Sequence, residues 1–179
     1  TLFRSVNSSW NFAMNMLDSV GIAGQTLVAT ALGAGSVSRA RQLTRATGRA
    51  GLVTGAIIGV VFAIVGLFAG HLFSPTPHVQ ILIAVGMVTM GVFFPLQGWM
   101  MAIDGILIGA RDYRYLAGTC TLTAVVYIAL ILVLASIVTP IMPNDLSRTA
   151  MLWAAFNVVL MGGRGLFNGL RVRSDVWMK

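Results

Sequence analysis

The stretch QGWMMAIDGILIGARDYRY, residues 97–115, places one carboxylate inside a long apolar run that ends in arginines. The carboxylate belongs to Asp104, and the first basic residue, Arg111, follows seven positions later. If this segment crosses a bilayer as a helix, an acidic side chain there costs at least about 2.5 kcal/mol on insertion scales. The charge must therefore be neutralised by a partner, hydrated by water or used in the function of the protein. The rest of the sequence has to indicate which of these applies.

The composition of the whole chain is that of a membrane protein. Of 179 residues, 57% are hydrophobic and 9% are charged, and the mean hydropathy is +0.86, whereas soluble domains carry about 25% charged residues. The net charge of +7 does not indicate nucleic-acid binding, because basic residues do not alternate with aromatic residues along a polar face and glutamate is absent. The single cysteine, Cys120, excludes a disulfide within the chain.

Five apolar stretches are long enough to cross a bilayer as helices, since a span needs about 20 residues. The third is too long for a straight span, at about 48 Å for a rise of 1.5 Å per residue, so we expect Pro95 to kink it. Gly51, Gly55 and Gly59 give the second helix a small face for packing against another helix. The stretches cover residues 9–33, 50–73, 79–110, 115–138 and 150–170 and predict an all-α membrane protein with five transmembrane helices.

The chain begins at Thr1 without an initiator methionine and without the basic, apolar and small-residue succession of a signal peptide, which predicts a truncated start. The opening TLFRS, residues 1–5, also matches a frequent translation of a sequencing adapter. We therefore assign residues 1–8 to a truncated or artefactual amino terminus, 9–171 to a transmembrane lobe and 172–179 to a basic cytoplasmic tail.

Arginine and lysine gather at one end of the predicted helices, which sets the orientation of the chain. Arg148 stands alone at the other end, and the positive-inside rule then places the carboxyl terminus in the cytoplasm. The run SRARQLTRATGR, residues 38–49, is either a topology anchor, which we favour, or a site for anionic lipid. The basic end comprises Arg39, Arg41, Arg45, Arg49, Arg111, Arg114, Arg171, Arg173 and Lys179.

Two charged residues inside the spans are expected to meet. Asp104 precedes Arg111 by seven residues and Arg164 precedes Arg171 by seven, so both lie about 10 Å from the inner boundary. On two helices that run in the same direction, these side chains can form an interior ion pair. We predict a structural or gating role for this pair.

Asp18 has no such partner and lies about 22 Å from the inner end of the first helix. Asn11, Asn15 and Gln25 share its helix face, at spacings of 4, 3 and 7. Lipid would leave such a polar stripe unsatisfied, so it faces a cavity or other protein. The stripe predicts Asp18, Asn15 and Gln25 as residues that bind a proton or sodium ion, with an interhelical hydrogen-bond cluster as the alternative.

Polar and methionine side chains predict a substrate cavity, although such stripes more often belong to ordinary packing. Methionine adapts to bulky apolar ligands. The candidate cavity residues are Asn11, Gln97, Met101, Asn157 and Met161. His71 and His78 have no ligand partner nearby in sequence, so no metal site is predicted. The spans contain no Ser/His pair, HExxH or paired aspartate motif, and we predict that the protein is not an enzyme.

Several motifs in order resemble a known family. They are MLDSVGIAGQTLVATALGAGSVSRAR at 16–41, LFSPTPHV at 72–79, FPLQGWMMAIDGILIGARDYRY at 94–115 and a terminal RVR at 171–173. Over roughly residues 9–177 the chain resembles the carboxyl-terminal half of multidrug and toxic compound extrusion (MATE) transporters. Within that family it looks closest to the DNA-damage-inducible F (DinF-like) branch of bacteria. The resemblance makes the five spans helices eight to twelve of twelve, which is most of the second six-helix lobe.

The resemblance implies an antiporter of the bacterial inner membrane. Such a protein exports cationic or amphipathic compounds in exchange for protons or sodium, without another cofactor, by alternating access between this lobe and a missing amino-terminal lobe. Gln97 stands where one branch has an acid, so that coupling site is expected to be absent. The motif residues carried over are Asp104, Gly105, Gly109 and Asp112 after the tenth helix, and Gln25, Gly33 and Arg41 after the eighth.

Two alternatives remain open from the sequence. One is a lipid-linked polysaccharide flippase of the same superfamily, which a more basic cavity would favour. The other is a small membrane assembly protein that does not transport.

Overall fold

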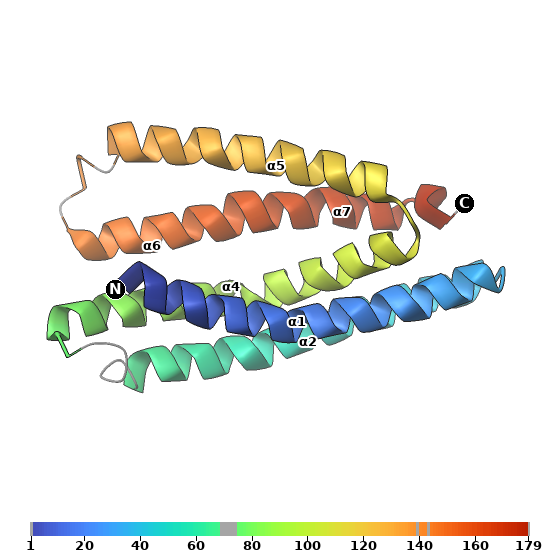
Figure 1. The fold of residues 1–179 in the computed structure, drawn as a ribbon, viewed down its shortest axis with the longest axis horizontal. Coiled ribbons are helices and arrows are strands. Elements are labelled where there is room, and N and C mark those ends of the chain that lie inside the picture. Colours follow the sequence, from blue (N-terminus) through green and yellow to red (C-terminus); the bar gives the residue numbers. More distant parts are fainter. Residues whose placement is uncertain (1, 69–74, 139, 143, 179) are drawn as a thin grey trace.

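In a computed structural model that describes residues 2–68, 75–138, 140–142 and 144–178, five long helical runs form an antiparallel bundle (Figure 1). Each run reverses the direction of the one before it. The runs are α1 (Leu2–Gly33), α2 (Val37–Phe68), α4 (Pro77–Gly109), α5 (Tyr113–Val133) continued by η1 (Leu134–Val138), and α6 (Asp145–Ala155), η2 (Phe156–Gly162) and α7 (Gly163–Arg173) without a break. Predictions for Thr1, His71 and Lys179 lie outside the described residues.

The predicted class, an all-α membrane protein, is confirmed. Four of the runs are long and apolar enough to cross a membrane, namely residues 37–68, 77–109, 113–138 and 145–173. α1 has a similar length but is not among them, because Asp18 and Gln25 lie within its apolar part.

The basic run of residues 38–49 belongs to a helix. α2 begins at Val37, whereas the apolar pattern predicted a span from about residue 50. A tight turn at Gly35, whose φ is 69°, separates it from α1. The helix continues through this run because arginine is a good helix former and a buried stripe that includes Ala40 and Thr44 persists beneath the exposed arginines.

Close backbone contact holds α2 against α4. A Cβ atom added at Gly51, Gly55 or Gly59 would strike a carbonyl oxygen of α4. The carbonyls belong to Gly98, Phe94 and Gly91. The packing role predicted for the three glycines is therefore confirmed, and the two helices approach as closely as their backbones allow.

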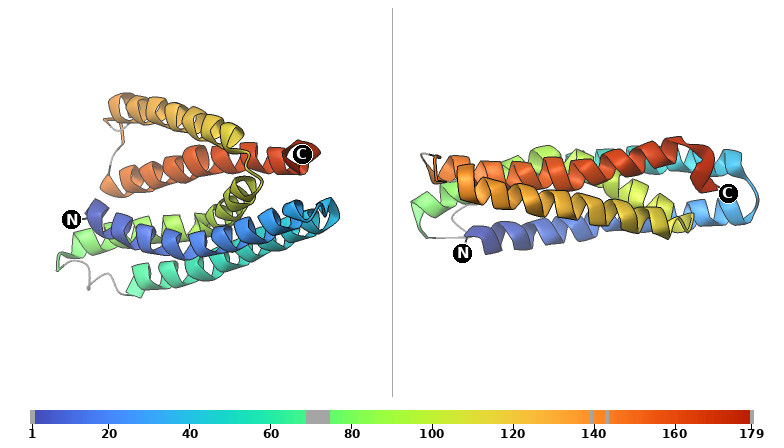
Figure 2. Two further views of the ribbon diagram at one scale, coloured as in Figure 1. Left: turned by 45° about the vertical axis from the view of Figure 1, so that its right-hand side comes forward. Right: turned by 90° about the horizontal axis from the view of Figure 1, so that it is seen from above.

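Pro95 lies within α4, and the helix changes direction along its length (Figure 2). Proline lacks the backbone N–H that would bond to the preceding turn, which is an established cause of such bends. The bend keeps a 33-residue helix in contact with α1 and α2 on one side and with α7 on the other.

The buried apolar side chains form two clusters along the bundle. One is built around Leu17, Met87 and Phe94, and the other around Val28 and Ile106. The second cluster includes Trp177 of η3 (Asp175–Met178), so the segment predicted as a basic tail folds back onto the helices in part. Beside these clusters α4 also buries two polar side chains, Gln97 and Asp104, and the candidate site is built around them.

Candidate functional site

The predicted ion pair between Asp104 and Arg164 is present. Arg164 Nη2 lies 2.7 Å from Asp104 Oδ2, and the side chain of Asp104 is only 6% exposed. Asn168 Nδ2 donates to the other carboxylate oxygen at 2.6 Å, and Thr119 Oγ1 donates to Asn168 Oδ1 at 2.8 Å. Two side chains of α7 thus bind one carboxylate on α4. The threonine connects α5 to this cluster through its hydrogen bond to Asn168. A gating role for this cluster stays a prediction.

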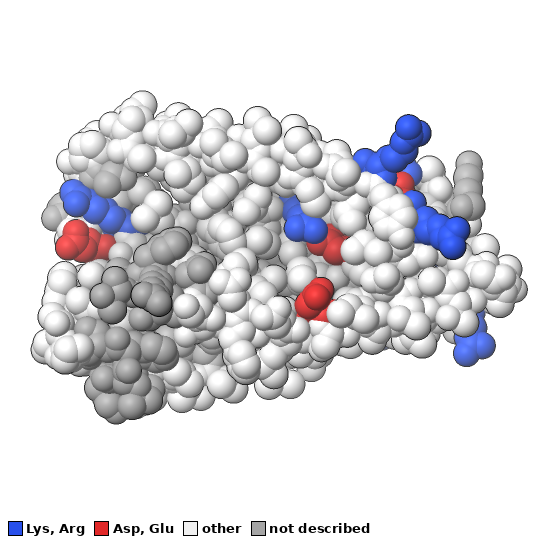
Figure 3. All heavy atoms as spheres, in the orientation of Figure 1, with Lys and Arg blue, Asp and Glu red and all other residues white. Residues whose placement is uncertain are grey.

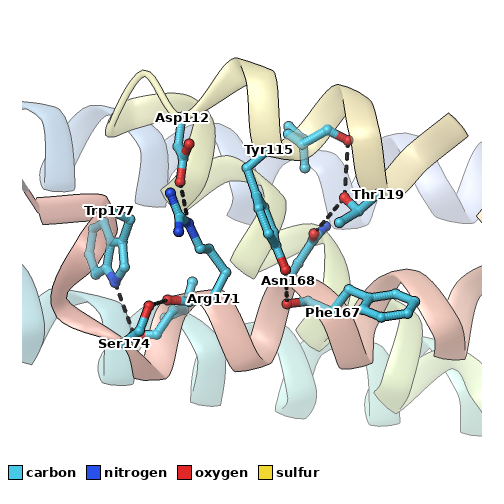
Figure 4. Close-up of polar contacts among 10 residues, drawn as sticks. Asp112, Tyr115, Thr119, Phe167, Asn168, Arg171, Ser174 and Trp177 are labelled. Atoms are coloured by element: carbon cyan, nitrogen blue, oxygen red, sulfur yellow. Dashed lines mark hydrogen bonds and ion pairs between the residues drawn. The ribbon is translucent and has the colours of Figure 1, made fainter. Parts of the chain in front are cut away.

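A second ion pair lies where the turn between α4 and α5 meets α7. Arg171 Nε donates to Asp112 Oδ2 at 2.7 Å, and its guanidinium lies 4.7 Å from the centre of the Tyr115 ring (Figure 4). The Tyr115 hydroxyl donates to the carbonyl of Phe167 at 2.8 Å. Asp112 follows Asp104 by eight residues and is the N-cap residue of α5, and Arg171 follows Arg164 by seven on α7, so the second pair joins α7 to the start of α5. This spacing is visible in the sequence, but Asp112 had been assigned only to the motif that the resemblance implies, and Arg171 only to the basic end of the helices.

Gln97 and Asn157 lie together in the interior, and neither side chain is exposed. Trp10 Nε1 donates to Gln97 Oε1 at 3.0 Å, Gln97 donates to Asn157, and Asn157 Nδ2 donates to the carbonyl of Trp153 at 2.7 Å. The sequence predicted that these two amides line a substrate cavity. In this structure they do not line an open cavity, because Trp10 of α1 and their own hydrogen bonds cover them.

The other predicted cavity residues are dispersed. Met161 is buried near Asn157 on η2, and Met101 packs against the first apolar cluster. Asn11 lies on the exposed side of α1. Of the five predicted cavity residues, Gln97 and Asn157 therefore lie together in the interior, whereas Asn11 lies on the outside of the bundle.

The polar stripe of α1 is divided between two environments. Asn15 and Asp18 are exposed, and Asp18 forms no ion pair with any described residue. Gln25 is half-buried against α4 and lines a pocket of about 320 Å³ together with Thr30 and Arg111.

The face drawn in Figure 3 carries charged side chains near both ends of the bundle and a small group of charged side chains near its middle.

Two motif glycines have a packing role. A Cβ atom on Gly105 would strike the carbonyl oxygen of Gly21, and one on Gly109 would strike that of Gln25. Gly33 has open space around it, and Arg41 is exposed on α2. After the motif the chain turns at Arg111 with a φ of 61°, a left-handed conformation that is uncommon for residues other than glycine.

No group of three or more metal-binding side chains occurs among the described residues. His78 Nε2 lies 3.5 Å from Asp145 Oδ2 at the exposed end of the bundle, away from the buried polar layers.

We expect Gln97→Leu to lower the free energy of unfolding by about 2 kcal/mol. The change leaves the Trp10 N–H and the Asn157 amide without a shared partner in the interior, and unsatisfied buried polar groups cost about 1–3 kcal/mol each. Denaturant unfolding in detergent micelles would measure it. Asn15→Leu is the matched control, because Asn15 is exposed, and a loss of the same size in both variants would contradict the buried network.

Comparison with known proteins identifies the family of the chain. The MatE family profile matches residues 3–133. Protein DETOXIFICATION 42 of Arabidopsis thaliana is 27% identical over 127 residues, which are 71% of this chain. The chain spans 25% of the length of that relative. No solved structure matched. Because the profile covers most of the described helices, and the motif glycines lie where α4 meets α1 within it, the chain belongs to the MatE family.

Proposed function

We propose that this chain is the second lobe of a secondary active exporter. The exporter moves cationic or amphipathic compounds out of a bacterial cell in exchange for protons or sodium, by alternating access, and the carboxyl terminus of the chain lies in the cytoplasm. Membership of the MatE family supports efflux transport. The observation that carries the coupling role is Asp18, an exposed carboxylate midway along the bundle without an ionic partner among the described residues.

The exposed stripe of α1 supports a protein partner for this lobe. Lipid cannot satisfy Asn15 and Asp18, so this face should meet water or polar side chains of another lobe. In transporters built from repeats, substrate and ion sites lie near the middle of the membrane between the repeats. A preceding lobe that packs on α1 would enclose Asp18 in such a place. Asp104 is the less suitable carboxylate for ion coupling, because Arg164 already neutralises its charge.

The same ion pair weakens the flippase alternative. A cavity for lipid-linked polysaccharide would be favoured by free interior basic charge, yet Arg164 binds a carboxylate 2.7 Å away. The family match likewise favours a transporter over an assembly protein that does not transport.

In the complete exporter, Asp18→Asn should reduce ion-driven transport at least about tenfold while leaving the amount of folded protein unchanged. The side chain is exposed, so its replacement by a residue of the same size should not destabilise the chain, whereas asparagine cannot carry the proton or balance the charge of sodium. Accumulation of a fluorescent organic cation in inverted membrane vesicles, driven by an imposed proton or sodium gradient, measures the effect.

Asp145→Asn is the matched control, since Asp145 is exposed at one end of the bundle. Full gradient-driven transport by the Asp18→Asn variant would contradict the coupling role. Transport by residues 6–179 reconstituted alone would contradict the two-lobe proposal. Sequencing upstream of the codon for Val6 tests the same point, since the proposal expects the reading frame to continue through a further apolar lobe.

A further inference from the structure

An open groove of about 520 Å³ lies between α4 and the run from η2 to α7. It is separate from the buried polar layers and from the stripe of α1. Its walls are apolar side chains and glycines, with one exception, the arginine at its end. The lining includes Leu96, Trp99, Gly162, Gly163, Leu166 and Arg173.

The groove exists because side chains are missing on one wall. A Cβ atom at Gly169 would strike the indole of Trp99, so that part of the helix must stay bare for the tryptophan to fit. At Gly162 the nearest neighbours of an added Cβ are the carbonyl oxygen of Asn157 at 3.4 Å and Leu96 Cδ2 at 3.7 Å. A side chain would fit at this position, and its absence leaves the space open.

The groove has the length and the charge distribution of one membrane leaflet. From Val158 to Arg173 the helix rises roughly 22 Å at 1.5 Å per residue. Half of a hydrocarbon core of about 30 Å, together with one headgroup layer, has a similar thickness. Arg173 is exposed in the last turn of α7 and forms no ion pair with the described residues. The groove thus runs from an apolar interior to one unpaired cation near the membrane boundary.

From this geometry we infer that the groove binds an anionic phospholipid. One acyl chain lies along Leu96, Trp99 and Leu166, and the headgroup phosphate accepts hydrogen bonds from the guanidinium of Arg173. The cation favours a lipid of net negative charge over a zwitterionic one, whose phosphate charge is offset by its own ammonium group. The inference depends on the chain spanning a bilayer and not on the proposed transport.

Native mass spectrometry of the chain released from detergent tests the inference, with equal amounts of phosphatidylglycerol and phosphatidylcholine added. We expect one retained lipid with at least a tenfold preference for phosphatidylglycerol. Arg173→Gln should abolish the preference, and Gly162→Leu should abolish retention because its side chain fills the groove. Arg45→Gln is the matched control, an exposed arginine on α2 outside the groove.

Each opposite result overturns the inference. Equal retention of the two lipids, or an unchanged preference in Arg173→Gln, would mean that the arginine does not select the headgroup. Retention unchanged by Gly162→Leu would place the lipid elsewhere, and no retained lipid at all would mean that protein or nothing occupies the groove. Thermal unfolding of each variant checks that it is folded, and Arg173→Gln, which alters an exposed side chain, keeps the test decisive if Gly162→Leu is unstable.

Discussion

Replacing Asp104 with asparagine should lower the free energy of unfolding by about 3 kcal/mol. Removing one partner of a buried ion pair costs about 3–5 kcal/mol, because the other charge is left without compensation. The lower end applies here, since the side chain of Arg164 is 29% exposed and water can hydrate part of it. Unfolding of the purified chain in micelles, followed by circular dichroism, measures the change.

A double-mutant cycle with Arg164→Gln separates the pair from its surroundings. The double variant should recover part of the stability lost by Asp104→Asn, with an interaction energy of at least about 1 kcal/mol. Asp145 and Arg148 provide the control, because their contact at 3.7 Å is exposed and such pairs contribute about 0–1 kcal/mol. Simple additivity at positions 104 and 164 would contradict a coupled ion pair.

Gly105→Ala should also destabilise the chain by about 3 kcal/mol. The added methyl would strike the carbonyl oxygen of Gly21, so α1 and α4 must separate, and overpacking typically costs about 1–3 kcal/mol. The contact is with backbone, which cannot rotate away as a side chain can. The same unfolding assay measures the loss, and a bulkier residue at this position should prevent folding.

Gly118→Ala is the matched control for this prediction. No atom lies within 4 Å of a Cβ at Gly118, so the substitution should stabilise α5 by up to about 1 kcal/mol through helix propensity. If Gly105→Ala proved neutral or stabilising as well, the two helices would not touch at this glycine.

Residue spacing along the chain was enough to predict two kinds of contact: an ion pair between side chains at equal depth in the membrane, and close packing at a helix face of small side chains. Asp104 and Arg164 could be paired because each precedes a boundary arginine by the same distance on helices that run the same way. The glycine face of α2 followed from a four-residue repeat. Neither inference required knowledge of which helix covers which.

Contacts that depend on neighbours could not be predicted in this way. The sequence placed Gln97 and Asn157 on the correct helix faces, but only the fold shows that Trp10 covers them and that they bind each other. Asp112 was predicted only as a motif residue and Arg171 only as a boundary charge, because the sequence does not show that α5 and α7 come together there. The groove beside Trp99 depends on glycines at irregular spacings, which predict no shape by themselves.

The π-helical segment η2 has a consequence for how this protein can change in evolution. A wide turn holds one more residue than an α-helical turn while leaving the helices on both sides in line. Asn157 within it and Arg164 beyond it both reach α4 in spite of the extra length. The loss of one residue inside 156–162 could therefore convert the wide turn to an α-helical one without rotating α7, whereas a deletion within α7 would turn every later side chain by about 100° away from its partner.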